Sequence, residues 1–110
     1  MMKEMREPTW LVLTALAGCG RLHGYAITQE AERLSGGRLR LRAGTLYAAL
    51  DRLVAEEIVE PAGEEVVGGR LRRYYRLSGK GRALLGAEAE RRAAVSGEAL
   101  RRLAARPGLA

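Results

Sequence analysis

A basic stretch near the end of the chain contains the side chains best suited to bind another molecule. Residues 70–82 include six basic residues, no acidic residue, and two adjacent tyrosines, Tyr74 and Tyr75. Guanidinium groups donate hydrogen bonds to phosphate oxygens, and tyrosine hydroxyls can add further contacts. The whole chain of 110 residues has a net charge of +6, which also favours a polyanionic partner. The predicted chemistry is therefore phosphate binding, as in nucleic-acid recognition.

Catalytic and metal-binding chemistry have little support in the sequence. His23 is the only histidine and Cys19 is the only cysteine. A zinc site needs several such ligands, and a disulfide within the chain needs a second cysteine. No glycine-rich loop has the spacing of a nucleotide-binding motif. We therefore expect no enzymatic activity, no cofactor and no metal, and we interpret His23 as a residue that packs or caps at the start of a helix.

The segment from Arg42 to Val59 is predicted to position side chains against the nucleic acid. Read as a helix, it has an apolar stripe that must be buried. The stripe consists of Leu46, Leu50 and Leu53. A second face is small and smooth enough to approach another surface closely. That face consists of Thr45, Ala48 and Arg52, and Tyr47 lies beside it.

A two-stranded ribbon is predicted to follow this helix. Residues 58–62 can form one strand and residues 71–77 a returning strand, with Gly63 and Gly68-Gly69 bracketing a turn region. A smooth-faced helix followed by an arginine-edged ribbon is a winged helix-turn-helix arrangement. In that arrangement the helix enters the major groove of DNA and the ribbon lies along the phosphates.

Two further helices and a short strand are predicted before this unit. Pro8 opens a first helix that is apolar on almost every side from Trp10 to Ala17, which suggests that it contacts a second subunit as well as its own core. A second helix ends at Leu34. Arginine and leucine then alternate over residues 38–42, as in a strand, with the arginines facing outward. Arg42 in particular would contact phosphates just before the recognition helix.

A long helix is predicted from Ser78 to about Arg106, where Pro107-Gly108 would end it. At 1.5 Å per residue it would span roughly 40 Å and project from a small domain. Its apolar stripe holds spacings of three and four residues. The stripe consists of Leu85, Ala89, Ala93, Ser96, Leu100 and Leu103. A dimer interface between two such helices is the natural interpretation, with a plain helical tail as the alternative.

Several motifs occur together in the order typical of one protein family. They are Pro8 to Leu16, His23-Gly24-Tyr25, Gly44-Thr45-Leu46-Tyr47 with Leu50 and Leu53, Gly69-Arg70, Arg72 to Ser78, and Gly81. With this combination the chain resembles the PadR family of bacterial transcriptional regulators. The single last helix is similar to that of the short subfamily. The family often has proline where this chain has Ala48.

The resemblance implies a winged-helix dimer that represses adjacent genes by binding inverted-repeat operators in double-stranded DNA. Some family members release DNA when a small-molecule inducer binds. Members that bind flat drugs can use a tryptophan in the last helix, and residues 78–106 contain no aromatic residue. An inducer of that kind is therefore not expected here, although Trp10 could line a central cavity, and release by a small-molecule inducer of another kind stays open.

We expect a mainly α-helical winged helix-turn-helix with a small antiparallel β wing over residues 1–77, and a dimerisation helix with a short tail over residues 78–110. The expected protein is a cytoplasmic transcriptional repressor without membrane contact. The expected DNA contacts are Tyr25, Arg42, Thr45, Tyr47, Ala48, Arg52, Arg70, Arg72 and Arg73. The expected dimer contacts are Trp10, Leu13, Leu85, Ala89, Ala93, Leu100 and Leu103. The alternative is a winged helix that binds another protein, which would need an apolar or acidic exposed helix face.

Overall fold

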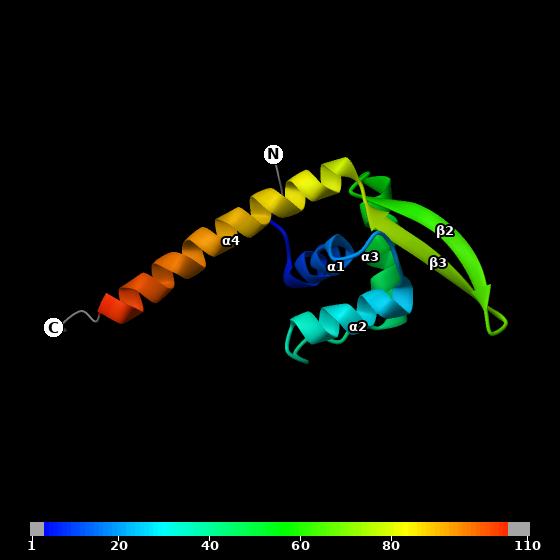
Figure 1. Cartoon of the computed structure of the whole chain (residues 1–110), viewed down its shortest axis with the longest axis horizontal. Coiled ribbons are helices and arrows are strands. Elements are labelled where there is room, and N and C mark those ends of the chain that lie inside the picture. The colour runs from blue at the N-terminus through cyan, green and yellow to red at the C-terminus, as the bar shows by residue number, and fades with distance from the viewer. Residues whose placement is uncertain (1–3, 106–110) are drawn as a thin grey trace.

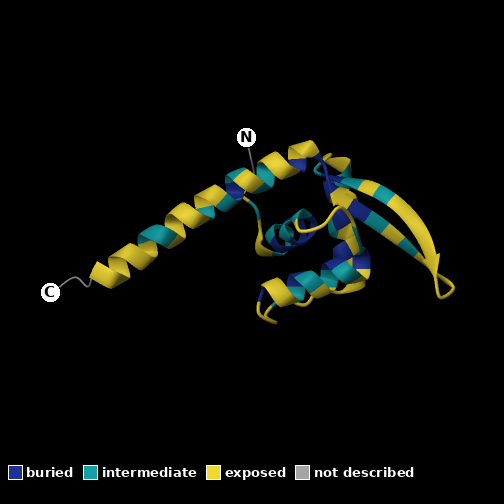
Figure 2. Cartoon of the chain, in the orientation of Figure 1, coloured by how far each residue is buried: buried dark blue, intermediate teal, exposed yellow. Residues whose placement is uncertain are grey.

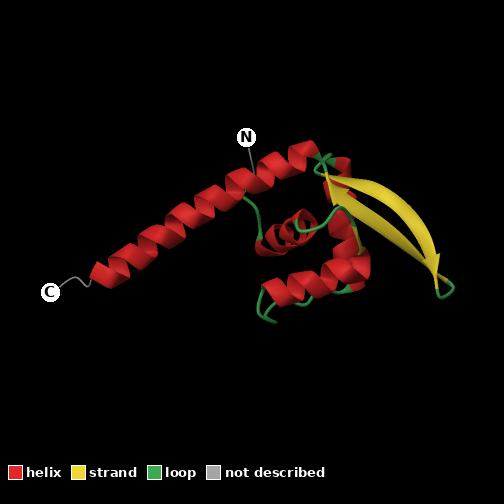
Figure 3. Ribbon diagram, viewed as in Figure 1, coloured by secondary structure: helices red, strands yellow, loops and turns green. Residues whose placement is uncertain are grey.

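The computed structural model of the protein describes residues 4–105, which form four helices and a three-stranded sheet (Figures 1 and 3). The helices are α1 (Glu7–Ala17), α2 (Gly24–Leu34), α3 (Ala43–Ala55) and α4 (Gly79–Ala105). The strands are β1 (Leu22–His23), β2 (Val59–Val67) and β3 (Arg70–Leu77). The sheet is antiparallel in the order β1-β3-β2. This is the winged helix-turn-helix arrangement that the sequence predicts.

The core lies between α1, the inner face of α3 and the base of the β2–β3 hairpin. The predicted stripe of α3 is confirmed, because Leu46, Leu50 and Leu53 are all buried. The apolar first helix supplies much of the remaining core. Its buried residues are Leu11, Val12, Leu13, Ala15 and Leu16. Residues of α1 and α3 thus share one closely packed core.

The β2–β3 hairpin forms the wing and extends well beyond the helices (Figure 1). Its turn consists of Gly68 and Gly69, with φ angles of 58° and 78°. Both angles are in the left-handed region that the favoured two-residue hairpin turn requires and that glycine adopts without steric cost. A shift of register between Pro61 and Glu64 marks a bulge, which contains Gly63.

Two sequence predictions about the strands are wrong, and a third strand was missed. Residues 38–42 form no strand, although Leu39 and Leu41 are half-buried and the arginines are exposed, because this segment pairs with no sheet edge. β2 does not end near Ala62 but continues to Val67, since the bulge accommodates Gly63 within the strand. β1, which pairs with Tyr74 and Tyr75 of β3, was not predicted because two residues leave no periodicity to read.

Ser78 begins α4 as predicted. Its hydroxyl oxygen accepts a hydrogen bond from the Gly81 N–H at 2.9 Å, and its hydroxyl donates to the Glu57 carbonyl at 2.7 Å. Gly81 is buried because the chain passes very close to it: a Cβ atom there would collide with the carbonyl of Ile58. The first turn of α4 is thus fixed to the link between α3 and β2. The predicted end near Arg106 lies outside the described residues.

The second half of α4 projects away from the body of the molecule, and Figure 2 shows it largely exposed. The described residues measure 64 × 31 × 22 Å, and their radius of gyration of 16.8 Å exceeds the roughly 13 Å of a compact chain of this length. No helix within residues 4–105 is both long and apolar enough to cross a lipid bilayer.

Candidate nucleic-acid interface

The exposed face of α3 lies opposite its buried leucines. Thr45, Ala48 and Arg52 are all exposed on it, as the helical spacing predicts. α3 follows an extended Arg42, receives no side-chain cap and has no acidic residue in its first turn. Its first backbone N–H groups therefore remain available, and the partial positive charge of the helix terminus favours an anion there.

The start of α2 has the same character. His23 precedes it without a side-chain cap, and its first turn also lacks an acidic residue. Tyr25, in that first turn, is 67 % exposed. By contrast, α1 has Glu7 in its first turn. α1 also lacks a side-chain cap, so uncapped starts without an acidic residue belong to the two helices of the helix-turn-helix unit, where a phosphate backbone would approach.

Tyr47 connects these two helices. Its side chain is only 37 % exposed, and its ring lies against Gly24 at the start of α2. A Cβ atom at Gly24 would lie 2.7 Å from Cζ of Tyr47, so a larger residue at this position would displace the ring. Burial raises the pKa of the Tyr75 hydroxyl, and the neighbouring Tyr47 raises it further. Tyr47 therefore packs between α2, α3 and β3 and does not project freely. The sequence analysis missed the role of Gly24, because the contact joins positions without a shared periodicity.

The arginines of the wing differ in their partners. Arg73 lies 3.7 Å from Glu64, and Arg76 lies 2.9 Å from Glu60 on the opposite strand. Among the described residues, Arg42, Arg70 and Arg72 form no ion pair with a carboxylate. Since adjacent side chains of a strand point to opposite faces, Arg72 and Arg73 lie on different faces of the wing.

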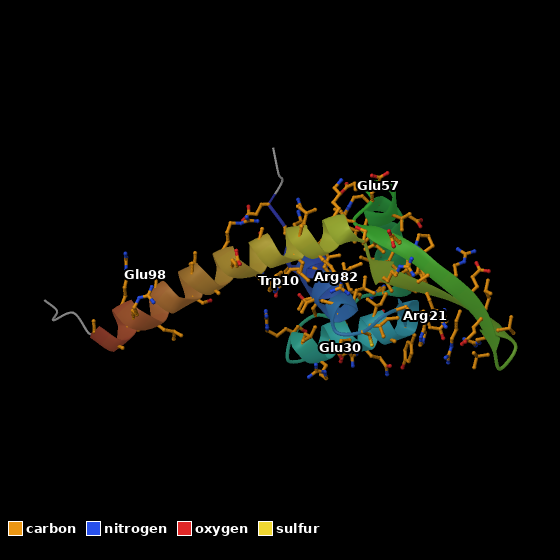
Figure 4. The ribbon with its side chains drawn as sticks, turned by 45° about the horizontal axis from the view of Figure 1, so that its top comes forward. Trp10, Arg21, Glu30, Glu57, Arg82 and Glu98 are labelled. Carbon is orange, nitrogen blue, oxygen red and sulfur yellow. The ribbon has the colours of Figure 1, made fainter. Side chains whose placement is uncertain are left out.

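A second cluster fixes the base of the wing to the segment before β1. The guanidinium of Arg21 lies 3.9 Å from the ring centroid of Tyr74 and donates a 2.8 Å hydrogen bond to the carbonyl of Ala62 (Figure 4). The Tyr74 hydroxyl donates to Glu65 at 2.9 Å, and His23 packs edge-on against its ring at 5.5 Å. Burial lowers the pKa of His23. His23 is thus a packing residue, as the sequence analysis proposes, and Arg21 is a structural arginine that it missed.

Arg52 is separated from the other candidate contacts. It is two helical turns from Thr45 and donates a 3.2 Å hydrogen bond to the hydroxyl of Thr9 in α1. It also borders a groove of about 760 Å³ between α1, the end of α3 and α4. Asp51, which the sequence analysis did not consider, is exposed beside it. The exposed face of α3 is therefore basic at its start and mixed in charge at its end.

The candidate dimer residues occupy three kinds of position. Leu13 is fully buried (0 % exposed), so its side chain cannot reach a partner directly, contrary to expectation. Trp10, Leu85 and Ala89 are half-buried, and Leu85 packs on the protomer's own core. Ala93, Leu100 and Leu103 are exposed. Only this last group forms a surface that a single protomer leaves uncovered.

Residues 12–87 match the transcriptional regulator PadR-like family. The chain belongs to this family. Membership confirms the predicted resemblance, and it identifies a transcriptional regulator and not an enzyme. Within residues 4–105, no group of three or more His, Cys, Asp or Glu side chains could hold a metal ion.

Two curated relatives of this PadR-like chain extend beyond it. A transcriptional regulator of Mycobacterium tuberculosis is 42 % identical over 69 residues, which are 63 % of this chain and 61 % of the relative. An uncharacterized 37.1 kDa protein in transposon TN4556 of Streptomyces fradiae is 48 % identical over 87 residues, which are 79 % of this chain and 23 % of the relative. The chain thus spans less than two thirds of the length of either relative.

Solved structures share the fold at low sequence identity. A PadR family transcription regulator from Clostridium difficile has a TM-score of 0.71 and 21 % identity, covering 89 % of this chain and 99 % of the other. Bacillus subtilis PadR, solved in complex with operator DNA, has a TM-score of 0.65 and 23 % identity, covering 77 % of this chain and 46 % of the other.

Proposed function

We propose that this PadR-like protein is a dimeric, cytoplasmic repressor that binds an inverted-repeat operator in double-stranded DNA. The observation that carries the proposal is the coincidence of a smooth exposed α3 face, two uncapped helix starts and three arginines without ion pairs. Elsewhere on the chain most arginines are held by glutamates, as Arg33 is by Glu30 and Arg101 by Glu98. Positive charge that no carboxylate neutralises is thus available where DNA would bind.

The proposed roles follow from the positions of the side chains. Ala48 lets α3 approach the base edges of the major groove, and Thr45 hydrogen-bonds there. Tyr25 and Arg42 contact phosphates at the two helix starts, and Arg70 and Arg72 contact phosphates from the wing. Arg73 also contacts a phosphate once its ion pair with Glu64 is broken. Tyr47 supports the α2–α3 pair, and Arg52 reaches a phosphate or a guanine only by giving up Thr9.

The proposed dimer rests on α4. Val95, Leu100 and Leu103 are among its most exposed side chains, and such a stripe needs a covering surface. The groove between α1, α3 and α4 has an apolar floor that includes Met5, Leu53 and Leu84 and a largely charged rim, and a second copy of α4 could enter it. The two copies of α3 would then face half-sites about one helical turn apart, roughly 10 base pairs. No inducer is part of this proposal, because the described residues of α4 include no aromatic side chain to stack on one.

Ala48→Glu tests the assignment of the α3 face. The DNA is first obtained by selecting fragments of the source genome that the wild-type protein retains. The variant should lose binding to that DNA in a gel-shift titration, because a bulky carboxylate then faces the phosphates and base edges. Its thermal melting should be unchanged, because position 48 faces away from the leucine stripe.

A normal melt with unchanged DNA binding would place the DNA-binding surface elsewhere. The alternative function, a winged helix that binds another protein, is favoured instead if the wild-type protein retains no genomic fragment. One observation supports that alternative: Val66 and Leu71 form an exposed apolar pair near the tip of the wing. Val66→Asp should lower the affinity of the wing for a protein partner without affecting the interaction of α3 with DNA.

A further inference from the structure

Arg92 joins the middle of α4 to the start of α1. Its guanidinium lies 4.4 Å from the ring centroid of Trp10, and Figure 4 shows Trp10 alongside α4. The same group donates a 3.0 Å hydrogen bond to the carbonyl of Met5 and lies 3.5 Å from the carboxylate of Glu7. Within α4 it donates to Glu88 at 2.8 Å. A single side chain thus contacts three positions near the start of α1.

Arg92 is the outermost point at which α4 is held by a polar contact to the rest of the described chain. The innermost point is the first turn, where Ser78 and Gly81 pack on the α3–β2 link. The two points are about 20 Å apart at 1.5 Å per residue. Beyond Arg92, the polar side-chain contacts of α4 among the described residues stay within the helix, from Arg101 and Arg102 to Glu98. Leu85 packs on the core between these two points, and Arg92, as the attachment farthest along the helix, limits how far the direction of α4 can vary.

We propose that Arg92 is a positioning residue that sets the direction of α4 and thereby the half-site spacing that the dimer accepts. This inference rests on the proposed function. With the first turn as pivot, a rotation of about 10° would move the far end of α4, about 36 Å away, by about 6 Å. That displacement approaches the rise of two base pairs, about 3.4 Å each. A small change in the contacts of Arg92 would therefore alter the half-site spacing that the dimer accepts.

The neighbouring charges supply a matched control. Arg91 also pairs with Glu88, at 2.6 Å, but among the described residues it forms no hydrogen bond or ion pair with α1. Arg91→Ala and Arg92→Ala remove the same charge from adjacent positions of one helix and disturb the same carboxylate. Only Arg92→Ala also removes the contacts of α4 with Met5, Glu7 and Trp10. Glu7 remains paired with Arg38 at 3.4 Å in either variant.

The direct test measures the distance between the two copies of Cys19, the only cysteine, which is exposed beside α1. Spin labels on Cys19 report this distance in the dimer by pulsed electron resonance, without DNA. Wild type and Arg91→Ala should give one narrow distribution, and Arg92→Ala a broad one. An Arg92→Ala distribution as narrow as that of wild type, or the absence of a dipolar signal in wild type, would overturn the inference.

The second measurement uses operators whose half-sites are moved together or apart by single base pairs, with a lone half-site as reference. Wild type and Arg91→Ala should lose about a hundredfold in affinity when the spacing is wrong by two base pairs, since simultaneous binding is lost. Arg92→Ala should lose less than about tenfold, with unchanged affinity for the lone half-site.

These outcomes distinguish a wrong role for Arg92 from a failure of the proposed DNA-binding function. A wild-type spacing profile in Arg92→Ala overturns the inference alone, whereas no binding by wild type to any duplex overturns both. Arg92→Lys, which keeps the charge but not the planar set of donors, replaces Arg92→Ala if that variant fails to fold. If both variants unfold, Arg92 acts on stability and the inference is wrong.

Discussion

The glutamates of β2 hold some of the arginines that the wing would offer to DNA. Glu64 pairs with Arg73 and Glu60 with Arg76, whereas Arg72 has no such partner. Exposed ion pairs of this kind contribute at most about 1 kcal/mol to stability, so they exchange readily for a phosphate. Each exchange nevertheless reduces the free energy gained on binding DNA. We therefore expect the wing to bind non-specific DNA less tightly than its arginine content implies.

Glu64→Gln should raise the affinity for non-specific DNA, because Arg73 is then free to contact a phosphate. The slope of log affinity against log salt should become steeper by up to about 0.9 per subunit. Fluorescence anisotropy with a duplex of random sequence over a salt series measures both quantities.

Glu90→Gln is the control for Glu64→Gln. It removes the same charge from an exposed position of α4 that has no ion pair among the described residues. Its effect on non-specific affinity should be clearly smaller. Equal effects of the two substitutions would mean that net charge, and not the Arg73 pair, controls binding.

Single residues were predicted well where helical spacing determines exposure, and less well where a tertiary contact does. Thr45 and Ala48 are exposed because their positions on α3 oppose its leucines. Tyr47 has the same local sequence environment, yet it packs on Gly24, which lies on another helix. Arg52 is drawn to Thr9 in α1. No pattern within residues 42–59 contains these two partners.

At the scale of elements, α4 depends on one close backbone approach at Gly81. Gly81→Ala should destabilise the protein by about 1–3 kcal/mol, because the added methyl group meets the Ile58 carbonyl, which belongs to the backbone and cannot turn aside. Gly86→Ala is the matched substitution on the same helix, with nothing within 4 Å of the added atom.

The Gly86→Ala variant should gain about 0.5–1 kcal/mol, because alanine loses less conformational freedom in a helix than glycine. Urea denaturation followed by circular dichroism measures the free energy of unfolding of both variants. Equal stabilities would show that the link before β2 moves to accommodate the methyl group at position 81.

The elements themselves were predictable in proportion to their length. The 27-residue α4 and the leucine stripe of α3 each contain several periods of an apolar pattern, and both were located correctly. Residues 38–42 alternate as a strand does, yet a strand also requires a neighbour with free backbone groups, and the segment has none. Composition alone cannot reveal such a missing neighbour.

At the scale of the whole molecule, the exposed outer half of α4 is the main reason to expect a dimer. Leu100→Asp combined with Leu103→Asp should give monomers, because two carboxylates would be buried at the proposed interface without partners. Analytical ultracentrifugation at micromolar concentration measures the effect. A wild-type protein that sediments as a monomer would contradict the prediction.

Val66→Asp combined with Leu71→Asp is the control for the dimer variant. It makes the same change of charge at two exposed apolar positions of the wing, which lies at the opposite end of the molecule from the outer half of α4 (Figure 1). This protein should remain dimeric. Loss of the dimer in both variants would point to a general effect of added negative charge.

The projecting half of α4 has a consequence for how the protein responds to its own abundance. Residues 93–105 make up about thirteen residues of helix with no core beneath them, a length that is marginal for a helix alone in water. If the α4 helix of a second copy packs against this segment, folding of the segment and association of the two protomers occur in one step. The concentration of the DNA-binding species then varies with the square of the protomer concentration when the protein is scarce. A gene controlled by this regulator would accordingly switch over a narrower range of protein levels than a monomer could produce.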